Sequence, residues 1–309
     1  MDLSIIIVTW NCKDDLRQCL ASLARAGPPA REIIVVDNAS TDGTPLVTEE
    51  FPGPVACIAN RENRGFAGGN NQGIRRATGR YILLLNPDTV VHPGALQGMV
   101  GFLDEHPDAW VVGPTMLNGD GSLQRVGVHF PTLWDLFVEA VMLDRLFPQT
   151  RLFGHHRALY RNPEEPGQVD YVQGSCLMIR RSVLEQVGNL DEGYFMYFEE
   201  ADLCRRVSAA GGTVWFAPVG EVVHVGSGEF GHFDERRILH YHRSLIRFFG
   251  RYHGRRSGIP LRLILLLRSG IRIALWALVY LVRPAVRTRA RSSCTGYLRT
   301  LAVAFRSSP

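Results

Sequence analysis

The chain lacks several features that mark common classes of protein. Its six cysteines are scattered, with no C-x-x-C pair, which argues against a cysteine zinc cluster and favours free thiols in a reducing compartment. Lys13 is the only lysine, which argues against a nucleotidyltransferase with a lysine-rich phosphate clamp. No G-x-G-x-x-G follows the first apolar run, which argues against an NAD enzyme. The N-terminal residues have no basic region and too short an apolar run for a signal peptide, so none is expected.

Acidic residues are absent from the last part of the chain. Residues 236–309 hold sixteen arginines and no Asp or Glu. The preceding 235 residues carry 18 basic and 30 acidic side chains, so the net charge of +4 combines an acidic body of −12 with a tail of +16. A tail of this charge binds phosphate groups, either in nucleic acid or in anionic lipid.

The apolar segment of this tail, residues 259–282, is long enough to span a bilayer, but its arginines argue against a simple span. On a helical wheel Arg262, Arg268 and Arg272 share about one third of the circumference, and the rest is almost wholly apolar. This pattern predicts an in-plane interfacial helix with its arginines at anionic headgroups. A core-packed helix and a partner-binding helix are the alternatives. Nucleic acid is not expected, because the charges interleave with Leu and Ile rather than with aromatic and polar side chains.

Apolar runs and helical patterns alternate through the first part of the chain. Buried strands are predicted at residues 3–10, 32–37, 55–59 and 81–85, with helices near residues 13–26, 44–51 and 70–77 between them. This alternation predicts a doubly wound, mainly parallel α/β sheet flanked by helices. Ligands bind such sheets at the carboxyl ends of the strands, where Asn11, Asp37 and Asp88 fall.

The second half is less regular. It predicts a hairpin within residues 111–130, an amphipathic helix at 134–147 and strands at 169–180, 213–217 and 221–225. His224 lies between apolar residues in the last of these strands, where a histidine is more often a core residue with satisfied hydrogen bonds than a ligand.

Two acids follow buried strands directly. Asp37 can accept hydrogen bonds from a nucleobase or from ribose hydroxyls, and the alternative is an Asx turn or a helix cap. Asp88, in the segment Asn86-Pro87-Asp88, can bind a hard divalent cation that carries substrate phosphates, although N-P-D is also a common turn.

A glycine-rich segment, NRGFAGGNN, occupies residues 63–71 and enters a predicted helix. Backbone N–H groups in such a segment can approach a diphosphate. The alternative is a tight turn with an Asn cap.

Residues 194–206, YFMYFEEADLCRR, place three carboxylates in the first turn of a predicted helix. Acidic side chains are stable at a helix N-terminus, and Asp202 can pair with Arg206 four residues on. The functional alternative places one carboxylate in an aromatic-walled cleft as a general base.

The order and spacing of these motifs resemble glycosyltransferase family 2. The set comprises TWN, VVDNASTDGT, NRGFAGGNN, LLNPDT, YFMYFEEADLCRR and VVHVGS, and the resemblance covers roughly residues 3–230. It implies the GT-A fold and a reaction that inverts configuration at the sugar. The carboxylate segment is similar to that of bacterial rhamnosyltransferases of cell-wall or O-antigen assembly.

The resemblance also implies the roles of individual residues. Glu200 would be the catalytic base, and Asp88 with His224 would bind a Mg²⁺ or Mn²⁺ ion that stabilises the leaving diphosphate. The chain departs from the commonest family pattern at Asn86, which replaces the first acid of the D-x-D motif, and at Glu199-Glu200, which replaces an E-D pair. The expected donor-binding residues are Thr9, Asn11, Asp37, Asn38, Arg64, Gly65, Asn70 and Asn86, and the expected acceptor-binding residues are Asp191, Tyr197, Glu199 and Trp215.

The sequence therefore predicts a membrane-associated inverting glycosyltransferase. Residues 1–230 form the expected catalytic domain, with a nucleotide-binding half at 1–110 and an acceptor half at 111–230, and residues 231–309 form the basic amphipathic tail. We expect a nucleoside-diphosphate sugar as donor, with dTDP-rhamnose as a candidate beside UDP-sugars, and a lipid-linked or polysaccharide acceptor. The expected location is the cytoplasmic face of the cell membrane. The alternative is a non-catalytic, membrane-bound sensor or scaffold that binds a sugar nucleotide.

Overall fold

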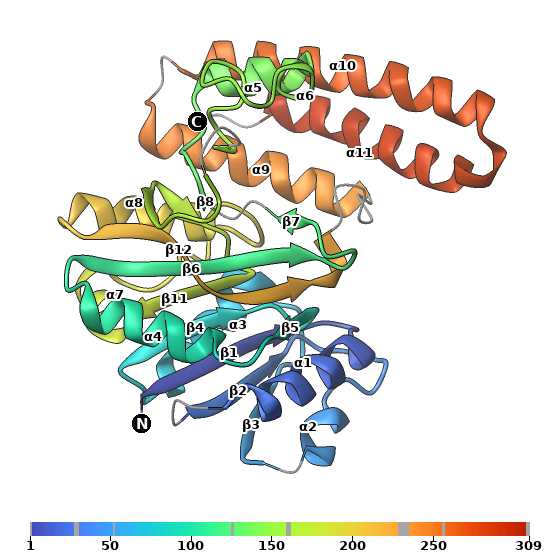
Figure 1. Cartoon of the computed structure of the whole chain (residues 1–309). Helices are drawn as coiled ribbons and strands as arrows, with labels where there is room; N and C mark the ends of the chain where they lie inside the picture. Colours follow the sequence, from blue (N-terminus) through green and yellow to red (C-terminus); the bar gives the residue numbers. More distant parts are fainter. Residues whose placement is uncertain are drawn as a thin grey trace. The chain divides into compact units, whose positions relative to one another are not determined.

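A computed structural model of the chain describes residues 2–27, 31–51, 53–124, 127–158, 162–227, 235–254 and 257–306. The chain divides into two compact units, which we call the sheet unit and the helical unit (Figure 1). The sheet unit comprises residues 1–129, 161–195 and 199–229, and the helical unit comprises residues 130–160, 196–198 and 230–309. The helical unit therefore contains an internal segment as well as the basic tail.

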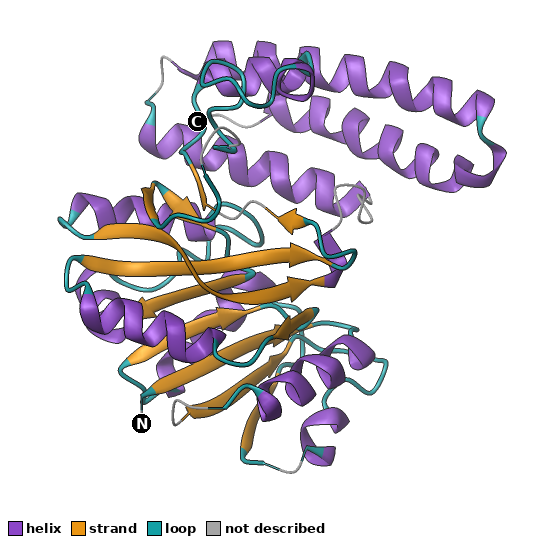
Figure 2. Ribbon diagram, viewed as in Figure 1, coloured by secondary structure: helices purple, strands orange, loops and turns teal. Residues whose placement is uncertain are grey.

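A mixed, mainly parallel sheet forms the centre of the sheet unit (Figure 2). In spatial order its strands are β3 (Val55–Ala59), β2 (Arg31–Asp37), β1 (Leu3–Thr9), β4 (Tyr81–Leu85), β11 (Cys176–Arg180), β6 (Ala109–Asn118), β12 (Thr213–His224) and β5 (Thr89–Val91). The short strands β7 (Leu123–Gln124) and β9 (Gly167–Val169) pair with β6 and β12, whereas β8 (Gly127–Val128) and β10 (Tyr171–Val172) pair with each other. Six strands share one direction. β1 is parallel to β2 and β4, β2 is parallel to β3, and β6 is parallel to β12. β11 lies between β4 and β6 and is antiparallel to both, so β4 and β6 also run in the same direction.

Helices cover the sheet, as the alternating sequence predicts. They are α1 (Lys13–Arg25), α2 (Leu46–Glu50), α3 (Gly65–Arg76), α4 (Ala95–Glu105), α7 (Arg181–Val187) and α8 (Glu199–Ala209). Alternate residues of β1, namely Leu3, Ile5 and Ile7, join the α1 and α4 side chains in one buried cluster. The predicted helix-flanked α/β sheet is thereby confirmed for this unit.

Helix α3 lies close to β1 because its glycines have no side chains. A Cβ on Gly69 would lie 2.7 Å from a Val8 methyl carbon, and one on Gly73 would clash with Ile6. The glycine-rich segment is therefore helical from Gly65, rather than a loop that leads to a helix near residue 70. Glycine lowers helix propensity, so the sequence alone disfavours this start, and packing against the sheet compensates.

Strand β12 differs from the two short strands that the sequence predicts. Residues 213–224 form one strand, whose register against β6 shifts between Phe216 and Glu221. The irregularity accommodates the intervening residues without ending the strand, and His224 is its last residue.

The helical unit consists of α5 (Leu133–Ala140), α6 (Leu143–Leu146), α9 (Glu235–Tyr252), α10 (Gly258–Val282) and α11 (Arg287–Arg306). The single helix predicted at residues 134–147 is broken at Met142, which adopts a left-handed conformation with φ of 62°. Helix α5 begins with a capping box, in which Thr132 and Asp135 each accept a hydrogen bond from the other's backbone N–H.

One arginine of α10 lies in the interior of the helical unit, against the prediction that the α10 arginines face lipid headgroups. Arg268 Nη1 lies 3.4 Å from a carboxylate oxygen of Glu139 on α5, and its guanidinium lies over the Tyr241 ring of α9 at 5.4 Å. A charge out of water requires such partners. This part of α10 is therefore core-packed, which was the alternative interpretation of the same pattern.

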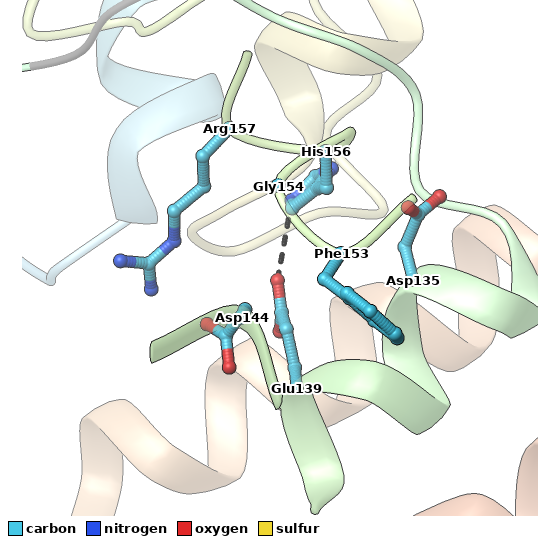
Figure 3. Close-up of a pocket in the computed structure, with 7 residues that line it drawn as sticks. All are labelled: Asp135, Glu139, Asp144, Phe153, Gly154, His156 and Arg157. Carbon is cyan, nitrogen blue, oxygen red and sulfur yellow. Dashed lines mark ion pairs between the residues drawn. The ribbon is translucent and has the colours of Figure 1, made fainter. Parts of the chain in front are cut away.

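Glu139 also faces His156 at 3.8 Å, in a small pocket within the helical unit (Figure 3). The pocket is lined by Asp135, Glu139, Asp144, Phe153, Gly154, His156 and Arg157. Two of its carboxylates already have structural partners, because Asp135 caps α5 and Glu139 pairs with Arg268.

Candidate functional site

The functional residues expected from the sequence gather where parallel strands end. Thr9 and Asp37 are paired at the ends of β1 and β2, Asn86 follows β4, and His224 ends β12. Because these strands share one direction, their ends lie at the same edge of the sheet, which we call the carboxyl edge.

Asp37 is buried at this edge, with hydrogen bonds to both carboxylate oxygens. The Thr9 hydroxyl donates to Oδ1 at 3.1 Å, and the Ser40 backbone N–H donates to Oδ2 at 2.9 Å. The bond to Ser40 is the turn interaction that the structural alternative predicts. Each oxygen has a second lone pair, so the same carboxylate can still accept from a ligand.

Asn11 connects the loops that follow β1 and β2. It adopts φ of 50°, its side-chain oxygen accepts from Thr41 N–H at 2.8 Å, and its own N–H donates to the Ser40 hydroxyl at 2.8 Å. Its expected contact with a donor would therefore come in addition to a structural role.

Asn38 and Gly65 fix the start of α3. The Asn38 amide donates to the Gly65 carbonyl at 3.0 Å and accepts from Asn60 at 3.0 Å, so this buried side chain is engaged within the protein. Gly65 has φ of 73°, and a Cβ there would clash with the Phe195 carbonyl. Phe66 N–H donates to that same carbonyl at 2.7 Å. The glycine-rich segment therefore packs directly on the residues that lead into the carboxylate helix.

Arg64 and Asn70 differ in exposure. Arg64 precedes α3 and is exposed, whereas Asn70 is buried within the helix. The Asn70 amide donates to the Phe66 carbonyl at 2.9 Å, and its Oδ1 has no hydrogen-bond partner among the described residues. Arg64 is the member of this segment whose side chain reaches solvent.

Asp88 and His224 meet at the carboxyl edge. Asp88 Oδ1 lies 3.1 Å from His224 Nε2, and the Asn86 amide lies 3.2 Å from the same nitrogen. The other ring nitrogen, Nδ1, lies 3.1 Å from Gln124 Oε1. With Gln124 as acceptor, Nδ1 carries the proton, and the lone pair of Nε2 accepts from the Asn86 amide beside Asp88.

This pair fits a divalent cation. A carboxylate oxygen and an imidazole lone pair are two acceptors, and a cation that both coordinate satisfies each of them. Within the described residues no third His, Cys, Asp or Glu joins them in a metal-ligating group. Mg²⁺ and Mn²⁺ accept the remaining ligands from phosphates and water, so two protein ligands are consistent with an ion that arrives with a diphosphate.

The carboxylate segment places its first acid in the interior. Glu199 is 3% exposed at the start of α8, and its Oε2 has no hydrogen-bond partner among the described residues. Burial, and next the charge of Glu200, raise the pKa of Glu199 well above its ordinary value. Asp202 pairs with Arg206 at 2.9 Å, as the spacing predicts. Glu200 is less buried than Glu199, so Glu200 is the more accessible of the two.

A turn at Gly174–Ser175 lies between the carboxylate helix and Asn86, which precedes Asp88 by two residues. A Cβ on Gly174 would lie 3.8 Å from Glu200 Cβ, and the Ser175 carbonyl accepts from Asn86 N–H at 3.0 Å. Glu200 and Asn86 are therefore neighbours of the same two-residue turn. The sequence analysis did not identify this turn, because nothing in QGSC itself marks it as part of a site.

Gly226 and Gln124 are two further residues that the sequence analysis missed. A Cβ on Gly226 would clash with Asp88 Oδ2, so this glycine, within the VVHVGS motif, permits the close approach of β12 to Asp88. Gln124 reaches His224 from the hairpin after β6, and no local signal connects residues 100 positions apart.

The expected acceptor residues Asp191, Tyr197 and Trp215 each contact other parts of the protein. Asp191 forms a turn in which its side chain accepts from Gly193 N–H at 2.8 Å. Tyr197 belongs to the helical unit, where its ring meets Tyr241 at 5.9 Å. Trp215 lies near the opposite end of β12 from His224, packed on Phe102 at 5.7 Å, as in ordinary core packing. Against β6, Trp215 pairs with Val112 and His224 with Asn118, so the two lie six β6 residues apart, or about 20 Å along the sheet.

Comparison with protein families supports the interpretation of these motifs. Residues 4–188 match the family model described as "Glycosyl transferase family 2". The chain is 28% identical over 291 residues to an N-acetylglucosaminyl-diphospho-decaprenol L-rhamnosyltransferase of Mycobacterium tuberculosis, covering 87% of this chain and 94% of that protein. It is 27% identical over 255 residues to rhamnosyltransferase WbbL of Escherichia coli K12, covering 80% of this chain and 92% of that protein.

Solved structures show the same fold. The mannosyltransferase PcManGT from Pyrobaculum calidifontis, in complex with GDP-Man and Mn²⁺, superposes with a TM-score of 0.58 at 17% identity over 97% of this chain and 86% of that chain. GalNAc-T7 with UDP, GalNAc and Mn²⁺ superposes with a TM-score of 0.56 at 18% identity over 72% of this chain and 43% of that chain. At these identities the likeness shows the GT-A fold and nothing more specific.

Proposed function

Because the chain belongs to glycosyltransferase family 2, we propose that it transfers a sugar with inversion from a nucleoside-diphosphate donor to a lipid-linked acceptor. The observation that carries the proposal is the corner formed by Asp88, His224 and Gln124, which adjoins the Gly174–Ser175 turn beside Glu200. A metal site for a diphosphate and a candidate base are thus neighbours of one turn.

In this proposal the carboxyl edge binds the donor. Asp37 accepts hydrogen bonds from the nucleoside, and the exposed Arg64 faces the phosphates from the start of α3. Asp88 and His224 would hold Mg²⁺ or Mn²⁺, with the ion replacing the hydrogen bond from Asn86 to Nε2, and Gln124 would orient the imidazole through Nδ1. When bound, the ion stabilises the negative charge that develops on the leaving diphosphate.

Glu200 is the proposed general base. As the acceptor hydroxyl oxygen attacks the anomeric carbon, Glu200 takes its proton, the new C–O bond forms, and the bond from that carbon to the diphosphate oxygen breaks. The electron pair leaves with the nucleoside diphosphate, so one in-line step inverts the configuration. A general base of this kind typically contributes about 10²–10⁴-fold to the rate.

The donor and acceptor classes follow from the relatives and from the tail. Two relatives are named rhamnosyltransferases, and the name of one includes a polyprenyl-diphosphate acceptor. We therefore place dTDP-rhamnose first among the donors, with UDP-sugars next, and a polyprenyl-diphosphate glycan first among the acceptors. An enzyme that uses such an acceptor works at a membrane surface, here proposed as the cytoplasmic face.

The test is a transfer assay with UDP-, GDP- and dTDP-sugars on membranes that carry polyprenyl-diphosphate glycans, with Mn²⁺ or with EDTA. We expect transfer from one donor, loss with EDTA, and loss in Glu200→Gln with donor binding retained. Glu185→Gln on α7, an exposed acid that pairs with Arg181, is the matched control and should behave as wild type. Donor binding without turnover for every sugar would overturn the proposed reaction, and full activity of Glu200→Gln would overturn the base.

A further inference from the structure

The two halves of α10 have different environments. Residues 258–270 include three buried side chains, Leu261, Leu265 and Ser269, and also Arg268 with its partners on α5 and α9. Residues 271–282 include no buried side chain. The first half is therefore partly buried within the helical unit, whereas the second half, which we call the distal segment, contacts α11 and leaves many of its side chains exposed.

The distal segment has an almost wholly apolar sequence, IRIALWALVYLV, with Arg272 as its one charged residue. Leucines, Tyr280 and Val282 are among its exposed side chains. The whole helix is long and apolar enough to cross a membrane, yet little of its most apolar stretch is buried. In water such a surface is costly, at about 25 cal/mol for each Å² of apolar area.

Arginines surround the end of this segment. Arg283 follows α10 directly, and Arg287, Arg289 and Arg291 occupy the first turns of α11. Two of these arginines lie along the distal segment. The guanidinium carbon of Arg287 lies 5.4 Å from the centre of the Tyr280 ring, and that of Arg289 lies 5.7 Å from the centre of the Trp276 ring. We call these four residues the arginine collar. Tyr, Trp and Arg beside apolar side chains are the residue types of a membrane–water interface.

We propose that the distal segment and the arginine collar dock the protein on an anionic phospholipid bilayer, with leucines in the acyl layer and guanidiniums at the phosphates. The docking surface would hold the enzyme near its lipid-linked acceptor, and this part of the proposal rests on the proposed function. Binding to lipid can nevertheless be measured without any transfer of sugar.

Two other arrangements fit less well. Twelve helical residues measure about 18 Å, which is too short for a hydrocarbon core of about 30 Å, so the distal segment enters one leaflet and does not span. A second copy that docked through the same surface would bring two arginine collars together, and residues 236–309 contain no Asp or Glu to pair with them. Anionic phosphates supply the missing charge.

The experiment compares two triple substitutions in the full chain by sedimentation with vesicles of phosphatidylcholine, with and without phosphatidylglycerol. The distal triple is Leu278→Ser, Leu281→Ser and Val282→Ser, at side chains 57%, 70% and 63% exposed. The proximal triple is Ile259→Ser, Leu263→Ser and Leu267→Ser, at 70%, 61% and 41%. Both triples remove exposed apolar groups of similar size from one helix, so each controls for the other's effect on folding.

We expect the wild type to bind vesicles that contain phosphatidylglycerol and to bind pure phosphatidylcholine far more weakly. The distal triple should lower the vesicle partition coefficient by about 100-fold or more, given the contribution of each buried CH₂ group. The proximal triple should change it by less than about threefold, and Gln at the four collar positions should remove the preference for the anionic lipid. Circular dichroism and donor binding should be unchanged in all variants.

Three results would overturn the docking surface: equal losses in both triples, equal binding to neutral and anionic vesicles, or a lipid-independent dimer that only the distal triple dissociates. The last result would assign the surface to a second copy. Loss of sugar transfer on membranes with retained vesicle binding would count against the proposed function and leave the docking surface intact.

Discussion

Buried charges have different partners in the two units of the molecule. In the helical unit, Arg268 has a carboxylate at 3.4 Å and an aromatic ring below its guanidinium. In the sheet unit, Glu199 is buried beside the like charge of Glu200, and its Oε2 has no hydrogen-bond partner among the described residues. A buried charge beside an opposite charge helps to hold the fold together, whereas a buried charge beside a like charge is kept at a cost, and such groups cluster at functional sites.

The difference implies two kinds of sensitivity. Substitutions at the carboxyl edge should change activity more than stability, and substitutions around Arg268 should change stability first. The following experiments measure activity, metal affinity or stability, so that either unit can contradict this division.

Asp88→Asn should have the largest effect on activity. It removes the carboxylate from the proposed metal site. The activation free energy should rise by several kcal/mol, which lowers kcat by about 10³-fold or more. The melting temperature should change little, and Asp14→Asn at an exposed position on α1 serves as the control. A loss of activity that matches a loss of folded protein would contradict the assignment.

Arg268→Met should have the largest effect on stability. It leaves Glu139 buried without its cation, which typically costs about 3–5 kcal/mol. Urea denaturation should show this loss, while Arg243→Met, at an exposed position on α9, should stay within about 0.5 kcal/mol of wild type. The double variant Arg268→Met with Glu139→Met should recover much of the loss, and no recovery would show that the two charges do not act as a pair.

Gln124→Leu should weaken the metal site without removing a ligand. It deprives His224 Nδ1 of its acceptor, and the loss of such a partner typically costs about 10–100-fold in metal affinity. Mn²⁺ titration of donor binding measures the change. Gln124→Glu keeps an acceptor oxygen and should retain most of the affinity; an equal loss in both variants would mean that packing, and not the hydrogen bond, is responsible.

Glu199→Gln should have the smallest effect of the four substitutions, and it should raise the stability of the protein, whereas Arg268→Met should lower it. The raised pKa means that folding favours the protonated form, so the ionised form lowers stability as the pH rises above the ordinary value of 4.5. Gln cannot ionise, so at pH 7 the variant should melt a few degrees higher than wild type. Below pH 4.5 the variant and the wild type should have the same melting temperature, because Glu199 is then protonated in both the folded and the unfolded chain. A variant that melts lower at pH 7 would show that Glu199 is stabilised as a carboxylate.

Much of the sheet unit is predictable from local patterns. The strands β1, β2, β3 and β4 coincide with apolar runs of β-branched and aliphatic residues, and the acids that follow them lie at the carboxyl edge. Such runs are informative because a strand buried on both faces can contain few polar residues. The meeting of Asp88 with His224 is different, because the prediction came from a family resemblance and no local pattern connects the two.

The remaining features depend on contacts between distant residues. The start of α3 was misplaced because its glycines disfavour a helix locally and are required only by Val8 and Ile6. The partners of Arg268 lie on α5 and α9, which a helical wheel of α10 alone does not contain. Trp215 was expected to bind the acceptor by its residue type alone, and the strand places it away from His224.

The position of β11 has a consequence for the time course of synthesis. β4 ends at Leu85, yet the strand that covers its edge, β11, begins at Cys176 and lies between β4 and β6. At about 5–20 residues per second, a ribosome needs roughly 5–20 s to make the intervening chain. During that interval the apolar strand YILLL presents an open edge on which another nascent chain can pair. Slower translation of residues 86–175 would lengthen this exposure, and a chaperone that holds the nascent chain would be most useful in the same interval.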